Sequence, residues 1–248
     1  MQYRVYLSTK IKADKLSSVT KGSCMIVIEP DDYSAKEIKD IKNKGYKVLG
    51  YISIGTLEKE RPWFNKYKKY RLKQLEDWKN EWYMDMTRTN WRQFLISRAK
   101  TLKAKGFDGY WCDNLDVYEY NKSTKMFAAC KAVLKQIKAV GGYVMVNGGS
   151  EWFDVAIDKK VAISKIVNGV TQEEVFSLIK NYSGTGKFGS QTKSQSSFYQ
   201  SLLKKLLKNG VQTFLLEYTK SDDVKKKIKD FCTKYKMTGY YISSSVNL

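Results

Sequence analysis

The chain has 248 residues with 45 Lys or Arg, 25 Asp or Glu and no His, so its formal net charge is +20 and its pI is near 9.6. The absence of histidine excludes Ser-His-Asp and Cys-His catalytic sites, His-ligated zinc and an imidazole pH switch, and leaves acid–base chemistry to carboxylates, Tyr, Lys or Cys. A content of 42% hydrophobic residues and two prolines predicts one large core and excludes collagen-like, proline-rich and membrane-spanning classes.

The N-terminal segment Met1–Leu7 is typical of a strand and lacks the apolar stretch and cleavage site of a signal peptide. We therefore expect a cytoplasmic protein or, if a leader has been removed, an extracellular one. The four cysteines have no Cys-x-x-Cys spacing. Buried free thiols are the expectation, and a disulfide pair is the alternative.

Nine short segments are rich in β-forming residues, and most are continuously apolar, as strands covered on both faces of a parallel sheet are. In chain order they are Tyr3–Leu7, Met25–Glu29, Lys47–Ser53, Glu81–Asp85, Gly109–Asp113, Tyr143–Asn147, Ile166–Val170, Val211–Glu217 and Tyr240–Ser243. Lysine-rich segments with helical apolar spacing separate most of them. Glycine ends four of the helices, and Asn90 and Ser221 are the expected N-caps of two.

Repeated strand–helix units without a linker predict one domain over residues 1–248, folded as a single (β/α)8 TIM-type barrel. A doubly wound open sheet is the alternative. A barrel needs eight strands, so one of the nine segments is extra, and we expect it at a terminus or near Glu81. Residues 181–197 are rich in Gly and Ser, which predicts a mobile loop over the active face or a surface connection.

The two signs of charge are distributed differently. Lysines lie on the polar helix faces and predict a solvated surface, with an anionic cell-envelope polymer or nucleic acid as the alternative partners; nucleic acid is disfavoured because no nucleic-acid-binding motif is present. The acids at or just beyond predicted strand ends are Glu29, Asp31, Asp32, Glu58, Asp85, Asp113, Asp116, Glu173 and Glu217. Those ends form one face of a barrel, so we expect a basic shell around an acidic mouth.

Asp113 ends an apolar strand at this catalytic face, and we interpret it as functional. Asp116 follows on the next turn, where an Asx-turn or N-cap role is equally expected. Glu173 ends a strand two further along, at about 10 Å, and inward-leaning side chains shorten this to the roughly 5–9.5 Å of paired glycosidase carboxylates. We interpret Glu174 as an acid in the first turn of a helix.

A third segment, Tyr51–Trp63, combines an acid, an arginine and aromatic rings, which suits a sugar. The alternative for Glu58 and Arg61 is an i,i+3 ion pair on a helix.

These motifs occur together in one order: Tyr51-Ile-Ser-Ile-Gly55, Glu58-x-x-Arg61, Gly106-Phe-Asp-Gly-x-x-x-Asp113-Asn-x-Asp116, Asn168-Gly-Val-x-x-Glu173 and Leu216-Glu-Tyr218. In this the chain resembles glycoside hydrolase family 114, the endo-α-1,4-polygalactosaminidase family, whose fold is a TIM barrel. The resemblance runs from about Ile26 to Tyr241 and implies that Asp113 and Glu173 are the catalytic pair. It implies a sugar site lined by Asp31, Tyr51, Glu58, Arg61, Asn114, Asp116, Asn147 and Tyr218. Thr56 departs from the family, which commonly carries an acid at this position.

We therefore predict a monomeric glycosidase that cleaves an amino-sugar-containing polysaccharide, with Asp113 as nucleophile or base and Glu173 as acid. We expect no metal or organic cofactor and no membrane span. The alternative is a non-catalytic carbohydrate or cell-envelope binding module on a barrel scaffold. A separation of more than about 10 Å between the two acids would favour that alternative.

Overall fold

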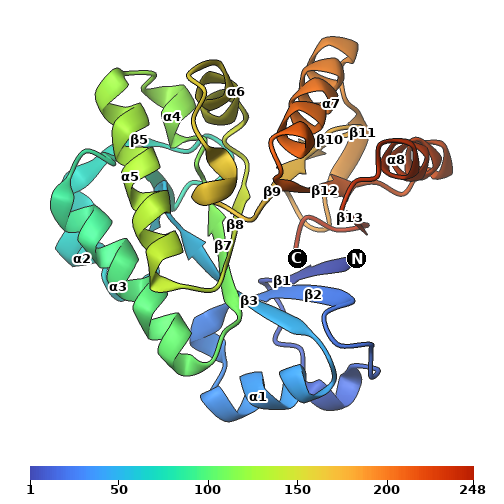
Figure 1. The fold of residues 1–248 in the computed structure, drawn as a ribbon, viewed down its shortest axis with the longest axis horizontal. Helices are drawn as coiled ribbons and strands as arrows, with labels where there is room; N and C mark the ends of the chain where they lie inside the picture. The colour runs from blue at the N-terminus through green and yellow to red at the C-terminus, as the bar shows by residue number, and fades with distance from the viewer.

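The computed structural model describes residues 1–248, and eight parallel strands form its central sheet. Their order in the sheet is β1 (Gln2–Tyr6), β2 (Cys24–Ile28), β3 (Lys47–Ser53), β7 (Gly109–Asp113), β8 (Tyr143–Asn147), β9 (Gly169–Glu173), β12 (Gln212–Tyr218) and β13 (Gly239–Ser243). The two edge strands, β1 and β13, lie side by side, and the chain termini meet there (Figure 1). The Leu7 amide donates to the carbonyl of Leu248 across this seam, at 2.7 Å. The predicted (β/α)8 barrel is confirmed as a nearly closed one.

Helices surround the barrel (Figure 1). They are α1 (Ala35–Asn43), α2 (Phe64–Tyr67), α3 (Thr89–Lys105), α4 (Val117–Tyr120), α5 (Thr124–Val140), α6 (Ser150–Asp158), α7 (Lys193–Lys208) and α8 (Asp222–Tyr235). Ser221 caps α8 as predicted, because its hydroxyl accepts from the Val224 amide. The prediction for Asn90 was wrong, since α3 begins at Thr89 with Arg88 in the cap position. None of the helices combines the length and apolarity needed to span a bilayer.

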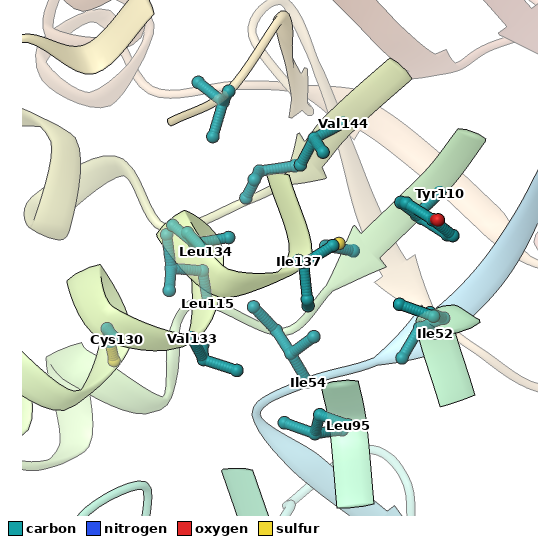
Figure 2. Close-up of a cluster of buried hydrophobic side chains, with 14 of the residues drawn as sticks. Ile52, Ile54, Leu95, Tyr110, Leu115, Cys130, Val133, Leu134, Ile137 and Val144 are labelled. Carbon is teal, nitrogen blue, oxygen red and sulfur yellow. The ribbon is translucent and has the colours of Figure 1, made fainter. Parts of the chain in front are cut away.

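The apolar pattern of the strands reflects burial on both faces of the sheet, against an inner core and an outer one. In β2, Met25 and Val27 point into the barrel interior, where they belong to a cluster of 10 buried residues. Ile26 and Ile28 point outward into a cluster of 42 buried residues between sheet and helices. Figure 2 shows part of the outer core, with side chains of β3, β7 and β8 against those of α3 and α5. Burial on both faces explains why strands such as β2 are apolar along their whole length. The four cysteines are all buried and free, as predicted.

The predicted strand that is surplus to the eight of the barrel is the segment near Glu81. It forms β6 (Glu81–Met84), which does not join the barrel. With β4 (Thr56–Glu58) and β5 (Arg71–Gln74) it forms a small antiparallel sheet inside the connection from β3 to α3. Of the two places expected for the extra strand, a terminus or the region near Glu81, the second is the correct one.

Residues 181–197 were predicted to be a mobile loop over the active face or a surface connection, and they contain more regular structure than a loop. The segment from β9 to α7 contains an antiparallel hairpin of β10 (Ser177–Asn181) and β11 (Lys187–Ser190), and α7 begins at Lys193. Phe188 stacks on Tyr218 with ring centroids 6.2 Å apart, and Ile179 also packs against the inner core. These two apolar contacts hold a segment whose composition is otherwise typical of a flexible loop.

The sixth barrel strand begins later than predicted. A 3-10 turn at Ile163–Lys165 precedes it, and Ile166 and Val167 pack into the outer core, so β9 runs from Gly169 to Glu173. Glu173 is consequently the last residue of its strand.

Candidate active site

Three neighbouring strands end in polar side chains at the same edge of the barrel. Asp113, Asn147 and Glu173 are the last residues of β7, β8 and β9. Asn147 Nδ2 donates to Asp113 Oδ1 at 2.9 Å and to Glu173 Oε1 at 2.5 Å. Because both oxygens bond to one nitrogen, they are no farther apart than the sum of these two distances. The wide separation that would favour a binding module is therefore absent.

The two carboxylates differ in how many of their oxygens accept hydrogen bonds from the protein. Glu173 Oε2 accepts from the Tyr218 hydroxyl at 2.7 Å, so both of its oxygens have partners. Asp113 Oδ1 also accepts from the backbone amide of Asn114 at 2.9 Å, and its Oδ2 accepts no hydrogen bond from the protein. One oxygen of Asp113 thus remains available to a ligand.

Burial raises the pKa of both acids. The pKa of Asp113 is raised to about 7, first by burial and then by the negative charge of Glu173. Burial also raises the pKa of Glu173, while hydrogen bonds from Asn147 and Tyr218 oppose the shift. Two carboxyl groups this close do not easily ionise together, because their negative charges repel each other. Such a pair can supply one protonated and one ionised group.

Asn147 leaves one of its own atoms unpaired. Its side chain is only 4% exposed, and Oδ1 is buried without a hydrogen-bond partner. A buried orphan acceptor is costly unless a ligand supplies the donor. The same residue that joins the two acids therefore carries an unpaired buried acceptor beside them.

The predicted Glu58–Arg61 pair exists, but it is not on a helix. Arg61 Nε donates to Glu58 Oε2 at 2.7 Å, and its Nη2 donates to Glu29 Oε2 at 2.9 Å. The Tyr51 hydroxyl donates to Glu58 Oε1 at 3.2 Å. Asp31 accepts from Arg98 Nη2 at 2.9 Å with both carboxylate oxygens. These ion pairs join the ends of β2, β3 and β4 into one wall of the site.

Asn114 and Asp116 use their side chains to hold the protein together. Asn114 has a left-handed backbone, with φ of 65°, and its Nδ2 donates to Ser53 Oγ at 3.0 Å and to Thr56 Oγ1 at 2.9 Å. Asp116 Oδ1 accepts from the Gly149 amide at 2.8 Å, and burial raises the pKa of Asp116 to about 6. A Cβ on Gly148 would lie 2.1 Å from Asp116 Oδ2, so this turn requires glycine. Asp116 therefore fixes the loop after β8 and makes no side-chain N-cap bond.

Glu81 is a site residue that sequence reasoning missed. Its Oε1 accepts from Thr56 Oγ1 and, at 3.3 Å, from Asn114 Nδ2. Burial raises the pKa of Glu81 to about 7, and the charges of Glu58 and Asp113 add to the shift. Glu81 begins a strand outside the barrel, so the strand-end rule could not find it. It places a carboxylate against Thr56, the position where the resembling family commonly carries an acid.

Two other acids support the hairpin after β9. Glu217 is fully buried on β12 and accepts from the amides of Phe176 and Ser177, the latter at 2.9 Å. Glu174 has a left-handed backbone, with φ of 57°, and accepts from the Ile179 amide. The prediction that Glu174 opens a helix was wrong, because a hairpin follows it.

A cleft of about 1290 Å³ opens at this face. All ten site residues named from the sequence line it. Its acids are Glu29, Asp31, Glu58, Glu60, Asp77, Glu81, Asp113, Asp116, Glu173 and Glu174, and its bases are Arg61, Lys79 and Arg98. Of the acids expected at this face, Asp32, Asp85 and Glu217 do not line the cleft. No group of three or more Cys, Asp and Glu side chains is arranged to hold a metal ion. The expected acidic mouth is therefore present in a chain of charge +20.

Comparison with known proteins identifies relatives of the whole barrel. An uncharacterized protein of Methanocaldococcus jannaschii is 26% identical over 239 residues, which is 88% of this chain and 66% of that protein. The glycoside hydrolase domain of PelA from Pseudomonas aeruginosa has a TM-score of 0.78 at 15% identity, covering 100% of this chain and 96% of that one. Aspergillus fumigatus Ega3, solved in complex with galactosamine, has a TM-score of 0.72 at 17% identity, covering 100% and 92%. These structures share the fold. Residues 2–245 match the family model of glycoside-hydrolase family GH114, and the chain therefore belongs to this family.

Proposed function

We propose that this glycosidase hydrolyses an amino-sugar-containing polysaccharide of the polygalactosamine type, with Asp113 and Glu173 as its catalytic pair and residues 1–248 as one catalytic unit. The observation that carries the proposal is the shared donor: Asn147 Nδ2 bonds to both carboxylates. Their pKa values, raised by burial, suit a pair in which one group is protonated and the other ionised.

The unpaired Oδ2 of Asp113 supports its assignment as the nucleophile, with Glu173 as the acid. Asp113 Oδ2 attacks the anomeric carbon, while protonated Glu173 gives its proton to the leaving glycosidic oxygen. The C–O bond breaks, and the sugar is left as an ester of Asp113. Glu173, now ionised, then takes a proton from water as the water attacks the same carbon and releases Asp113. The short separation supports this double displacement, because retaining glycosidases place the two groups about 5–5.5 Å apart.

The lining supports a cationic chain as substrate. Acids outnumber bases in the cleft, and Arg61 and Arg98 are already bonded to carboxylates. The ammonium groups of unacetylated amino sugars would pair with the remaining acids. The charge of +20 repels such a chain at long range, but salt screens this repulsion beyond about 8–10 Å, so the lining decides binding. Galactosamine, the ligand of Ega3, is a sugar of this class.

The test is the release of reducing ends from α-1,4-galactosaminoglycan and from an anionic amino-sugar wall polymer. We expect wild-type protein to act on the cationic polymer and Asp113→Asn to lose most turnover while it remains folded by circular dichroism. Asp40→Asn is the matched control, because Asp40 is an acid on α1 that pairs with Lys36 away from the cleft.

The outcomes separate the candidate functions. Release from the anionic polymer alone would contradict the cationic substrate. No release from either polymer, together with salt-dependent retention on one of them, would favour the binding module.

A further inference from the structure

Two segments inserted into the barrel meet over the catalytic face. One is the connection of residues 54–88, which carries Trp78 between β5 and β6. The other is the connection of residues 174–192, which carries Tyr182 directly after β10. The two rings have centroids 5.6 Å apart and planes inclined at 69°, and both line the same cleft as Asp113 and Glu173. The contact therefore joins the two insertions across the cleft.

Trp78 is highly exposed to solvent for a large hydrophobic residue. It is 49% exposed and is one of three large hydrophobic side chains that are exposed, with Met1 and Tyr120. Its edge-on contact with Tyr182 does not cover its ring as parallel stacking would. An exposed indole at the margin of a cleft offers an apolar face together with an N–H donor. These are the features that stack on the C–H face of a sugar ring and bond to its hydroxyls.

The charged residues near Trp78 and Tyr182 affect which kind of sugar can bind there. Burial raises the pKa of the Tyr182 hydroxyl, and the negative charges of Glu174, Asp77 and Glu173 raise it further. These three carboxylates line the same cleft as the hydroxyl. Lys79 lines the cleft from the same loop as Asp77 and offsets part of this charge. The remaining potential is negative and favours a sugar that carries an ammonium group.

We propose that Trp78 and Tyr182 form an outlying subsite that binds one amino-sugar unit of the polymer, beyond the unit held between Asp113 and Glu173. The inference rests on the proposed function for its substrate class. A subsite of this kind contributes affinity only when the bound chain is long enough to reach it. Short saccharides that occupy the catalytic pair alone gain nothing from it.

The experiment measures binding apart from turnover. In a Glu173→Gln background, isothermal titration gives the affinity for α-1,4-linked galactosamine disaccharide and octasaccharide. We expect Trp78→Ala and Tyr182→Ala each to weaken octasaccharide binding about tenfold, the loss of one aromatic contact, with disaccharide binding unchanged. Tyr120→Ala is the matched control, because Tyr120 is 48% exposed and packs on another tyrosine but does not line the cleft.

Three results would overturn the subsite: unchanged octasaccharide affinity, an equal loss for both ligands, or the same loss in Tyr120→Ala. Absence of octasaccharide binding to the parent protein would overturn it as well. Reducing-end release by the wild type reports the proposed function separately. If no ends are released but the length-dependent loss is observed, the hydrolase proposal fails and the subsite stands.

Discussion

Tyr218 donates its hydroxyl hydrogen to Glu173 Oε2 at 2.7 Å, from the strand next to the one that Glu173 ends. The hydroxyl is nearly fully buried, with Tyr218 only 3% exposed. A donor of this kind stabilises the ionised carboxylate and opposes the rise in pKa that burial causes. Tyr218 thus tunes the group that we assign as the acid.

Tyr218→Phe removes this donor without changing the ring. The pKa of Glu173 then rises, so Glu173 stays protonated to higher pH, and the alkaline limb of the kcat profile moves upward. We also expect kcat at the optimum to fall by about tenfold or more, since a hydrogen bond to a charged group contributes about 1.5–3 kcal/mol. A pH series of initial rates measures both changes. An unmoved alkaline limb would assign it to another group.

The distance between the carboxylates predicts the stereochemistry of hydrolysis. Asn147 holds Asp113 Oδ1 and Glu173 Oε1 no farther apart than the sum of its two hydrogen-bond lengths, which is below the roughly 6.5–9.5 Å typical of an inverting enzyme. We therefore expect the first product to keep the anomeric configuration of the substrate. Proton NMR recorded within the first turnovers, before mutarotation, reads this directly. In the Asp113→Gly variant, azide should restore cleavage and give a glycosyl azide of the opposite anomeric configuration. If the wild type instead releases a first product of inverted configuration, Asp113 is not the nucleophile.

Glu81 acts on the site through Asn114. Its carboxylate accepts from the Asn114 amide, and the Asn114 backbone amide donates to Asp113. Glu81→Ala removes one hydrogen-bond acceptor from the side-chain amide of Asn114. We expect kcat to fall about tenfold while KM changes little. Glu81→Gln keeps an oxygen that accepts from Thr56 and Asn114, so it should recover most of the lost kcat. Equal losses in the two variants would show that the charge of Glu81, rather than its position, matters.

The sequence was sufficient to predict the barrel because most core strands are buried on both faces. Ile26 and Val27 face different cores, and the segment is apolar throughout. The same logic predicted that Asp113 and Glu173 lie at one edge of the barrel, since parallel strands end at one edge. This reasoning could not predict that Glu81 and Trp78 line the cleft. Their positions depend on how the inserted strands β4, β5 and β6 pair with one another, which no local periodicity encodes.

Buried carboxyl groups make the fold less stable as the pH rises. Burial raises the pKa of Asp113 and of Glu217 to about 7, whereas an unfolded carboxyl titrates near about 4. The folded state therefore binds more protons between about pH 4 and pH 7. The stabilisation from these protons is complete below the unfolded pKa and is lost as the pH rises through the folded one. We expect the Tm to fall across this interval.

Asp113→Asn removes one of these carboxyl groups, so the Tm of the variant should fall less as the pH rises. At pH 4.5 we expect its Tm to match the wild type, because Asp113 is then largely protonated in the folded protein. At pH 8 its Tm should be higher by about 3 °C or more, since 1 kcal/mol corresponds to about 2–4 °C in a chain of this size. Scanning fluorimetry across this range, with Asp40→Asn as the control, makes the comparison. A variant less stable than wild type at pH 8 would mean that the hydrogen bonds of ionised Asp113 outweigh its burial.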